Sequence, residues 1–497
     1  MMRRVLLLAC VLLGACAAAD PYRAAPVAAQ LAARDAAGDC ARRFAVLDTV
    51  IDALGVRDAA AVRVPGFPFV RVDRVHAALA TELDDARDAA RVRAWLDGVA
   101  ALDAQARRIE VANAALPAAA GGDLDALAHC RALLVGALDG ARDGAKLTAL
   151  RAAATVPDDY SDALRALGLY PLTRLAFAAG IRRWHEDTLA VFNQPEDALA
   201  RRGVRRIYGP RAAAAAVKPL ARDALGVPRA DAATLAALLQ RHAPVWDIDT
   251  ASDDDRIGAL VWQGAPAALA VDVAQPTVDA QVAYTRLAGR WQLQLVYTAW
   301  FAARPPQSRF DALAGPFDGV VWRVTLDDAL EPLVYDAIHP CGCYHLFFPT
   351  SRLAARPVEP SLDEGLFAPQ TAPALRPGQR LRLRIESRTH YLQRVAVAGE
   401  AAPDLVYGLR DADTLRSLPL PGGGTRSAFD RDGLLPGSER LERAFFWPMG
   451  IASAGQMRQW GRHATAFVGR RHFDDPALFD RYFLPGTAAA AANVITP

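Results

Sequence analysis

The chain is poor in cysteine and lysine, and neither sign of charge is in excess. It has 497 residues, of which only 6 are cysteines. Lys146 and Lys218 are its only lysines, so arginine supplies nearly all of the positive charge. The formal net charge is +2, from 57 basic and 55 acidic residues. This balance argues against nucleic acid as a partner, because binding to phosphates needs a surplus of basic side chains.

The motifs of several common enzyme classes are also missing. The sequence has no C-x-x-C-H haem attachment site, no H-E-x-x-H zinc-protease motif and no G-x-S-x-G nucleophile elbow. It also lacks a Walker loop and a G-x-G-x-x-G dinucleotide fingerprint. Any chemistry must therefore be sought in a less familiar group of residues.

The segment 339–345 concentrates the reactive side chains. Its sequence, His-Pro-Cys-Gly-Cys-Tyr-His, contains two histidines and two cysteines: His339, Cys341, Cys343 and His345. In an extended chain all four would point to one face, with successive ones roughly 6.5 Å apart. The outer two would be about 20 Å apart. One ion can therefore bind all four only if Pro340 and Gly342 bend the chain.

Three interpretations of this cluster stay open. The side chains could bind zinc or copper, with His390 as a further ligand and Asp336 and Glu386 as nearby carboxylates, although the spacing differs from familiar zinc motifs. Cys341 and Cys343 could instead form a strained disulfide. They could also be ordinary half-buried strand residues.

The first residues have the pattern of an export signal. Arg3 and Arg4 precede an apolar run, Val5 to Leu13, that is too short to span a membrane. The sequence Leu13-Gly14-Ala15-Cys16 follows and resembles the lipobox of bacterial lipoproteins. The resemblance covers residues 1–16 only. It implies cleavage before Cys16 and a membrane anchor of several acyl chains on Cys16.

The same resemblance implies a location in the cell envelope. Ala17 differs from the aspartate that is associated with retention in the inner membrane, so we expect the outer membrane, with the protein facing the periplasm. The alternative is cleavage after Ala17-Ala18-Ala19, which would release a secreted protein. The expected partners are the membrane, through Cys16, and an envelope protein.

Export also permits disulfide bonds. Cys10 belongs to the signal and Cys16 to the lipid anchor, so four cysteines remain for the folded body. We predict a Cys40–Cys130 disulfide, because both cysteines fall in predicted helices of one region. A long-range pair that includes Cys341 stays open.

The hydrophobic pattern predicts an α+β fold. Residues 16–245 have a helical period, interrupted by a predicted loop at 63–71, and form the expected α-helical domain. Residues 246–410 alternate between apolar and polar and predict a mostly antiparallel β-rich domain that carries the His/Cys cluster. A mixed segment with a short helix, 411–485, and a disordered tail, 486–497, complete the chain.

Two further groups of polar residues are candidates for a site. Ser453 and Gln456 predict a capping box at the start of a helix. That helix would carry a basic group: Arg458, Arg462, His463, Arg470, Arg471 and His472. The group is either a solvated helix face or a grip for an anion. Trp184-His185-Glu186-Asp187 is interpreted as surface or junction chemistry, because successive helical residues point in different directions.

Two hypotheses for the function follow. In the first, the protein is a lipid-anchored metalloprotein, whether hydrolase or oxidoreductase. Its ligands would come from the predicted cluster: His339, Cys341, Cys343, His345 and His390. In the second, it is a non-enzymatic envelope lipoprotein that binds a partner or supports assembly, and its cysteines are structural.

Overall fold

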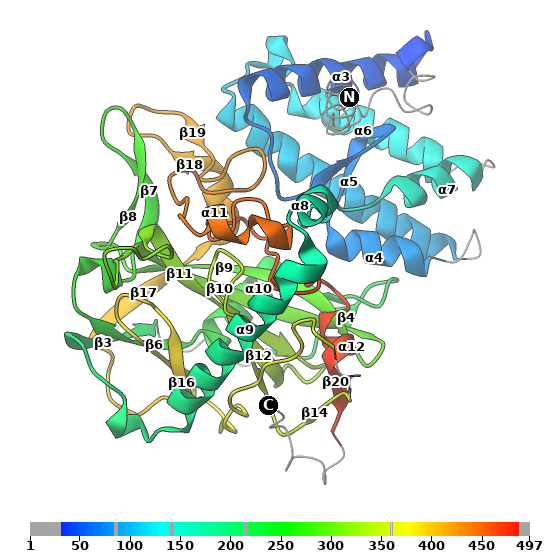
Figure 1. Ribbon diagram of the computed structural model, residues 1–497. Helices are drawn as coiled ribbons and strands as arrows, with labels where there is room; N and C mark the ends of the chain where they lie inside the picture. Colours follow the sequence, from blue (N-terminus) through cyan, green and yellow to red (C-terminus); the bar gives the residue numbers. More distant parts are fainter. Residues whose placement is uncertain are drawn as a thin grey trace, which may run out of the picture.

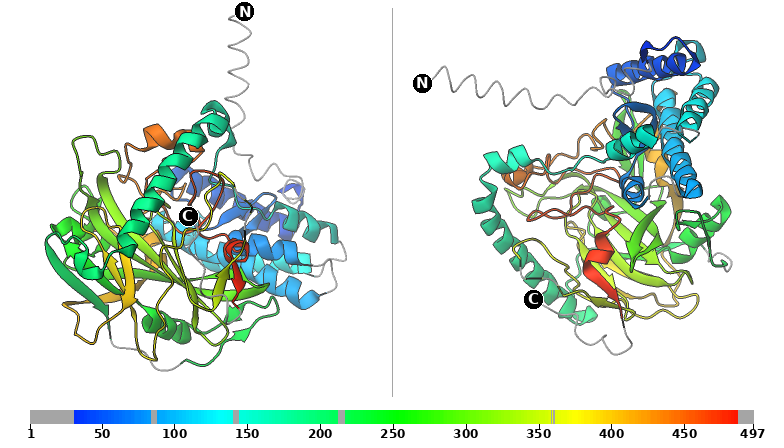
Figure 2. Two further views of the ribbon diagram at one scale, coloured as in Figure 1. Left: turned by 60° about the horizontal axis from the view of Figure 1, so that its bottom comes forward. Right: turned by 90° about the vertical axis from the view of Figure 1, so that its right-hand side faces the viewer.

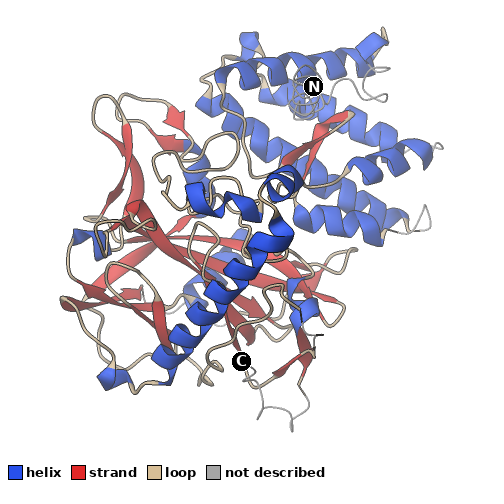
Figure 3. Ribbon diagram, in the orientation of Figure 1, coloured by secondary structure: helices blue, strands red, loops and turns tan. Residues whose placement is uncertain are grey.

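The computed structural model describes residues 31–83, 88–139, 144–211, 217–357, 359 and 361–486. The predicted signal, Cys16 and residues 487–497 lie outside the described residues. The fold is α+β, as predicted (Figures 1 and 3). A helical N-terminal region precedes a large, mostly antiparallel sheet, and a short helix lies near the end of the chain.

The N-terminal region packs its helices around one core. The helices are α3 (Ala36–Leu54), α4 (Arg74–Glu82), α5 (Ala89–Asn113), α6 (Leu124–Asp139) and α7 (Gly144–Ala153). Aspartates cap the first three, because Asp35, Asp73 and Asp88 each accept the N–H of the residue three positions on. Phe44 and Trp95 are fully buried in this core. The predicted Cys40–Cys130 disulfide is confirmed and joins α3 to α6.

The predicted loop at 63–71 is a β-hairpin instead. Strands β1 (Val62–Val64) and β2 (Phe67–Val72) pair antiparallel. Gly66 has a φ of 86° in the turn between them, a conformation that glycine adopts without strain. The Pro65-Gly66 pair excludes a helix, as predicted, but it also suits a tight turn between two strands.

A ten-stranded sheet forms the body of the molecule. Its strands, in spatial order, are β13 (Leu346–Pro349), β12 (Pro332–Ile338), β11 (Gly315–Leu326), β10 (Arg290–Arg304), β9 (Thr277–Leu287), β17 (Leu405–Asp411), β3 (Val204–Pro210), β6 (Val245–Thr250), β15 (Leu381–Ile385) and β16 (Leu392–Val397). Pairing is antiparallel from β13 to β9, between β3 and β6, and between β15 and β16. β17 is parallel to both of its neighbours, and β15 is parallel to β6.

Strand β3 lies in a range that the sequence pattern predicts to be helical. It pairs with β6 on one side and with β17 on the other, and Arg205 forms an ion pair with Asp247 of β6 at 2.5 Å. The segment is short, so its distant partners in the sheet decide its conformation more than its own pattern does.

Smaller elements surround this sheet. The remaining helices are α8 (Asp162–Leu167), α9 (Tyr170–Asn193), α10 (Ala232–His242), α11 (Arg443–Phe446) and α12 (Leu478–Tyr482). Short strand pairs are β4 (Ala221–Arg222) with β5 (Pro228–Arg229), β7 (Ala259–Gln263) with β8 (Ala268–Asp272), β14 (Leu353–Ala355) with β20 (Phe483–Pro485), and β18 (Leu418–Pro419) with β19 (Thr425–Arg426). None of the helices within the described residues is long and apolar enough to cross a membrane.

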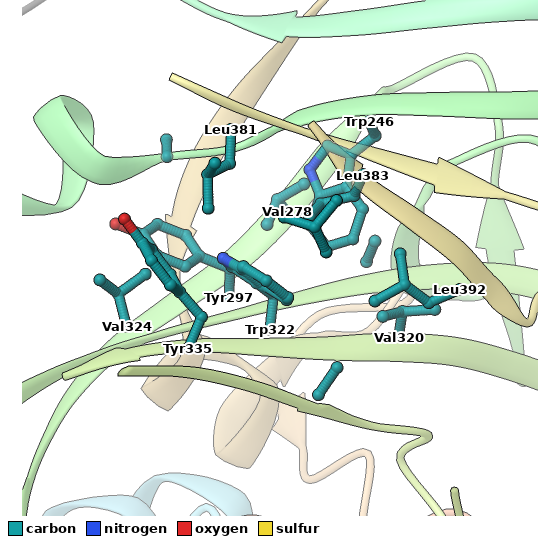
Figure 4. Packing of buried hydrophobic residues seen from close by; sticks show 14 of the residues in the cluster. Trp246, Val278, Tyr297, Val320, Trp322, Val324, Tyr335, Leu381, Leu383 and Leu392 are labelled. Carbon is teal, nitrogen blue, oxygen red and sulfur yellow. The ribbon is translucent and has the colours of Figure 1, made fainter. Parts of the chain in front are cut away.

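The sheet curls, so that strands from its two ends share one core. Figure 4 shows side chains of β6 and β15, such as Trp246 and Leu383, in the same cluster as Trp322 and Tyr335 of β11 and β12. Helix α9 lies across the sheet (Figures 1 and 2). Its Phe192 packs against Phe348 of β13, with ring centroids 5.8 Å apart. Arg394 of β16 donates to carbonyls at the end of the same helix. Helix α9 therefore bridges the two ends of the sheet.

The last segment covers the opposite face of the sheet. Phe473 packs on Val296 and Val321, and Phe479 of α12 packs on Phe347. Gly486, the first residue of the predicted disordered tail, donates its N–H to the Arg352 carbonyl at 2.7 Å. Within the described residues, both faces of the central strands are therefore buried.

The helix predicted to start at Ser453 does not form. Residues 453–472 run as turns and irregular chain. Gly455, Gly461 and Gly469 have φ values of 81°, 90° and 90°, which are incompatible with a right-handed helix. The side chains of this stretch therefore do not share a helix face.

Candidate functional site beside the 339–345 turn

Residues 339–345 form a tight turn at the end of β12. The N–H of Gly342 donates to the His339 carbonyl at 2.8 Å, and the N–H of His339 donates to the Cys343 carbonyl at 3.0 Å. Gly342 has a φ of 95°, and a Cβ on it would lie 2.3 Å from the Ala464 carbonyl oxygen. The chain therefore bends at Pro340 and Gly342, and the single face of an extended strand does not occur.

The five candidate metal ligands lie in three environments. His339 and His390 both contact Asp318, through Nδ1 at 3.2 Å and 2.8 Å. His345 contacts Asp336 through Nε2 at 2.8 Å. Cys341 and Cys343 are free thiols in an apolar cluster. Among the described residues, no three or more His, Cys, Asp or Glu side chains are grouped so that they could hold a metal ion.

His339 and His390 belong to a buried chain of alternating acids and imidazoles. Asp318 lies between the two histidines, and the far nitrogen of His390, Nε2, is 3.2 Å from Asp255. His390 is fully buried, stacks on Phe301 at 4.0 Å and has a φ of 54°. A non-glycine residue in this conformation is strained and is held there by its surroundings.

Neither acid of this chain is among the residues predicted from the sequence. Of the two predicted carboxylates, Asp336 does contact His345, whereas Glu386 accepts a hydrogen bond from Thr389 at 2.6 Å. Asp255 belongs to a polar turn after β6, and Asp318 lies near the start of β11. Nothing in the spacing along the chain places either acid beside a histidine, because the sheet makes these contacts.

The electrostatics of the chain follow from burial and mutual contact. Burial opposes ionisation of Asp318, but the two adjacent histidines hold the pKa of its carboxyl well below the ordinary value. Burial disfavours the charged form of His390, yet hydrogen bonds with Asp255 and Asp318 raise its pKa. For His339 burial dominates and lowers the pKa. At neutral pH we therefore assign a charged His390, an ionised Asp318 and a neutral His339.

A small cavity of about 220 Å³ adjoins this chain. It lies between helix α9 and both ends of the sheet, and His339 is part of its lining. A neutral His339 donates Nδ1–H to Asp318, which leaves Nε2 with a free electron pair. Such an imidazole can accept a proton from a bound molecule.

The main cavity lies on the other side of the turn and has a volume of about 470 Å³. Its walls come from helix α9, the 339–345 turn and residues between 442 and 471. Most of the lining is apolar or aromatic, including Phe177, Ile181, Trp184, Phe367, Phe446 and Phe467. Trp184, Tyr344 and Tyr391 line both cavities and form the wall between them. The His/Cys turn thus belongs to a pocket wall.

Comparison with known proteins gives no match for this chain. No family model, no curated protein and no solved structure is similar to it. The function must therefore be argued from the geometry and chemistry of the site.

The polar groups in the main cavity are few. They include His185, Cys343, His345, Glu364, Glu442 and Arg471. Burial and the nearby Arg471 lower the pKa of His185 to about 4, and His185 stacks on Phe367 at 3.9 Å. Burial lowers the pKa of His345 to about 3, and contact with Asp336 only partly offsets this. Both imidazoles are therefore neutral at pH 7.

The Trp-His-Glu-Asp sequence is divided between the cavity and the surface, since Trp184 and His185 are half-buried and Glu186 and Asp187 are exposed. Trp184 and His185 line the main cavity, and Trp184 lies 5.3 Å from Tyr344 between ring centroids. The sequence predicts no metal-binding residue in the helical range 16–245. Helix α9 contributes to the site only because it folds back across the sheet, and no local pattern predicts that.

The Cys343 thiol is not an activated nucleophile. A hydrogen bond with Cys341 and burial together raise the pKa of the Cys343 thiol well above its ordinary value. Thiol reactivity depends on the thiolate, so Cys343 is unreactive at neutral pH. The interpretation of Cys341 and Cys343 as packing residues agrees best with this environment.

The predicted basic group is dispersed. Arg458, His463 and Arg471 are buried, whereas Arg470 forms ion pairs with Asp158 and Asp162. Arg471 donates to the carbonyls of residues 364, 365 and 465. These arginines are used in internal contacts, and they do not form an anion grip on a helix face.

Proposed function

We propose that the protein is a lipid-anchored cell-envelope protein that binds a mostly apolar small molecule in the main cavity. The anchor is inferred from the lipobox-like residues that end at Cys16. Binding is inferred from one observation, a cavity of about 470 Å³ with an aromatic and aliphatic lining and few polar groups. Pockets for small molecules have this size and composition.

The cavity is partly open to the solvent, so it is a pocket and not a sealed void in the core. Lining atoms that face an empty apolar pocket lack contacts that a ligand could supply. Here several large aromatic side chains border the space without filling it. An apolar ligand would restore those contacts.

Transition-metal binding is the alternative function. The candidate ligands lie in three separate environments, which gives this alternative less support. They are His339 and His390 beside Asp318, His345 beside Asp336, and the thiols of Cys341 and Cys343. The metal content of the purified protein tests it. Stoichiometric zinc or copper that is lost in a His339→Ala, His345→Ala double variant would favour the metal over the cavity hypothesis.

Gly180 offers a test of the cavity hypothesis. This residue lies in helix α9, lines the main cavity and has open space around the position of a Cβ. A Gly180→Trp substitution should fill the space without disturbing the helix, because glycine is the weaker helix former. Gly136→Trp in α6 is the matched control, since Gly136 is also helical and open but lies outside the cavity.

The probe for this test is N-phenyl-1-naphthylamine, a neutral apolar fluorophore. We expect saturable fluorescence enhancement with the wild-type chain and with Gly136→Trp, and a loss of at least about tenfold in affinity with Gly180→Trp. The fluorescence that remains with Gly180→Trp measures how much of the probe partitions into detergent or lipid instead of the cavity. Equal binding by all three proteins would refute the cavity as the binding site.

A further inference from the structure

The carboxylate of Glu442 is the one acidic group in the main cavity lining that lacks a partner among the described residues. The residue is 4% exposed and lines the cavity. Its backbone takes part in hydrogen bonds, but its carboxylate has no hydrogen bond or ion pair within the described part of the chain. Burial raises the pKa of Glu442 to about 7. A buried polar group without a partner is costly and needs an explanation.

The neighbouring charges do not neutralise Glu442. Arg440 donates to the carbonyls of Pro316 and Phe317. Arg304 donates to the Thr389 carbonyl and to the Tyr391 hydroxyl, both at 3.0 Å. These two arginines point their donors at other groups, so their effect on Glu442 is only a longer-range attraction.

The other charged residues of the cavity neutralise each other. Glu364 accepts the backbone N–H groups of Phe467 and Val468, and Arg471 lies 3.6 Å from its carboxylate. His185 and His345 are neutral, and the charges of Glu364 and Arg471 cancel. Once Glu442 ionises, its carboxylate is therefore the only uncompensated charge among the described residues of the lining. The cavity is therefore negative, or neutral when Glu442 is protonated.

The backbone makes room for the Glu442 carboxylate. Gly455 has a φ of 81°, and a Cβ there would lie 1.6 Å from Oε1 of Glu442. A side chain at this position would displace the carboxylate. Because position 455 is a glycine, the acid can stay in the cavity wall.

The remaining lining suits a cation with an apolar body. His345 is fully buried and its Nε2 contacts Asp336, so it adds no positive charge to the cavity. The aromatic rings of Phe177, Trp184 and Phe446 add negatively polarised faces. A fatty acid or phosphate ester would bring a second negative charge beside Glu442 once that acid ionises.

We propose that the main cavity binds an amphipathic cation, whose apolar body fills the aromatic space and whose ammonium group pairs with Glu442. This inference rests on the proposed function, because it names the class of ligand for the same cavity. The pairing satisfies the buried acid and the cation together.

Three probes with one chain length separate charge from apolarity: decylamine, decanol and decanoate. Each is used at pH 8 to displace N-phenyl-1-naphthylamine from the full chain. We expect decylamine to bind about tenfold more tightly than decanol, and decanoate to bind most weakly. In Glu442→Gln, decylamine should fall to the affinity of decanol while decanol itself is unchanged.

Glu400→Gln is the matched control, since Glu400 is exposed and lies outside the cavity. It removes the same charge and should keep the preference for decylamine. Equal affinities of the wild-type chain for decylamine and decanol would overturn the assignment of a cation but leave the cavity hypothesis intact. Failure of N-phenyl-1-naphthylamine to bind at all would overturn both, so the two failures are distinguishable.

Discussion

At the scale of single residues, the site is defined by how each acid is partnered. Asp318 and Asp336 have imidazole or guanidinium partners, whereas the Glu442 carboxylate has none within the described residues. All three are buried. The same chemical group therefore stabilises the fold in one place and opposes it in the other, depending only on what lies beside it.

The unpaired acid should leave a signature in stability. Glu442 titrates near pH 4.5 when unfolded and at about 7 when folded, so the folded state becomes less stable as the pH rises between these values. Glu442→Gln removes this penalty. We expect the variant to exceed the wild type in free energy of unfolding by about 1–3 kcal/mol at pH 8, and to match it at pH 4.

Urea unfolding at the two pH values measures this difference without any ligand. Glu400→Gln should show no such dependence, because Glu400 is exposed. A Glu442→Gln variant that is less stable than the wild type at pH 8 would mean that the carboxylate is paired in solution. The inferred cation would then lose its main support.

The paired acid should behave in the opposite way. Asp318→Asn leaves the charged His390 with only one of its two carboxylates, so we expect a loss of about 3–5 kcal/mol in the free energy of unfolding at pH 7. The contribution of Asp318 is present above its unfolded pKa of 3.8 and is lost as the pH falls below it.

Chemical denaturation followed by tryptophan fluorescence measures the effect. Asp97→Asn is the control, since Asp97 is exposed and forms a helical ion pair with Arg93. If both aspartate variants unfold at the same urea concentration, the buried chain contributes nothing to stability.

At the scale of elements, the 339–345 turn and helix α9 create the two cavities. The turn packs closely against the backbone of Ala464, which leaves no room for a side chain on Gly342. Helix α9 then covers the gap between β13 and β16. Moving either element would change both cavities, because Trp184, Tyr344 and Tyr391 line both.

A single methyl group at Gly342 should disturb the turn. Gly342→Ala places a Cβ against the Ala464 carbonyl and strains a φ of 95°, so we expect a loss of roughly 2–4 kcal/mol in stability and weaker probe binding. Gly399→Ala is the control, because nothing lies within 4 Å of its Cβ position. Thermal unfolding and probe titration of both variants measure the effect. Unchanged unfolding and binding in Gly342→Ala would contradict the close contact.

At the scale of the whole molecule, the proposed export and lipid attachment predict a specific mass for the protein. From its own membranes we expect a chain that starts at Cys16 and carries acyl groups. Without reductant, the denatured protein should accept two alkyl groups, on Cys341 and Cys343, and two more after Cys40–Cys130 is reduced. Intact mass spectrometry reads all of these. A chain that starts after Ala19 would contradict the anchor, and no alkylation before reduction would reveal a Cys341–Cys343 disulfide.

Local patterns in the sequence are sufficient to predict the class of fold. The helical N-terminal region, the β-rich region that follows it and the Cys40–Cys130 disulfide follow from local periodicity or from shared helical context. Such patterns report which face of an element is buried, and this information is local. The hairpin at 62–72 and strand β3 were missed, because pairing with other segments decides the conformation of short strands.

The site depends on contacts between segments that are distant in the sequence. One interpretation of the 339–345 segment from sequence is that its side chains bind a single metal ion. In the structure, His339 and His390 contact Asp318, and His345 contacts Asp336. Trp184 and Glu442 line the same cavity, although more than half of the chain separates them in the sequence. Contacts at such separation carry no local signal, since the curl of the sheet and the path of α9 bring them together.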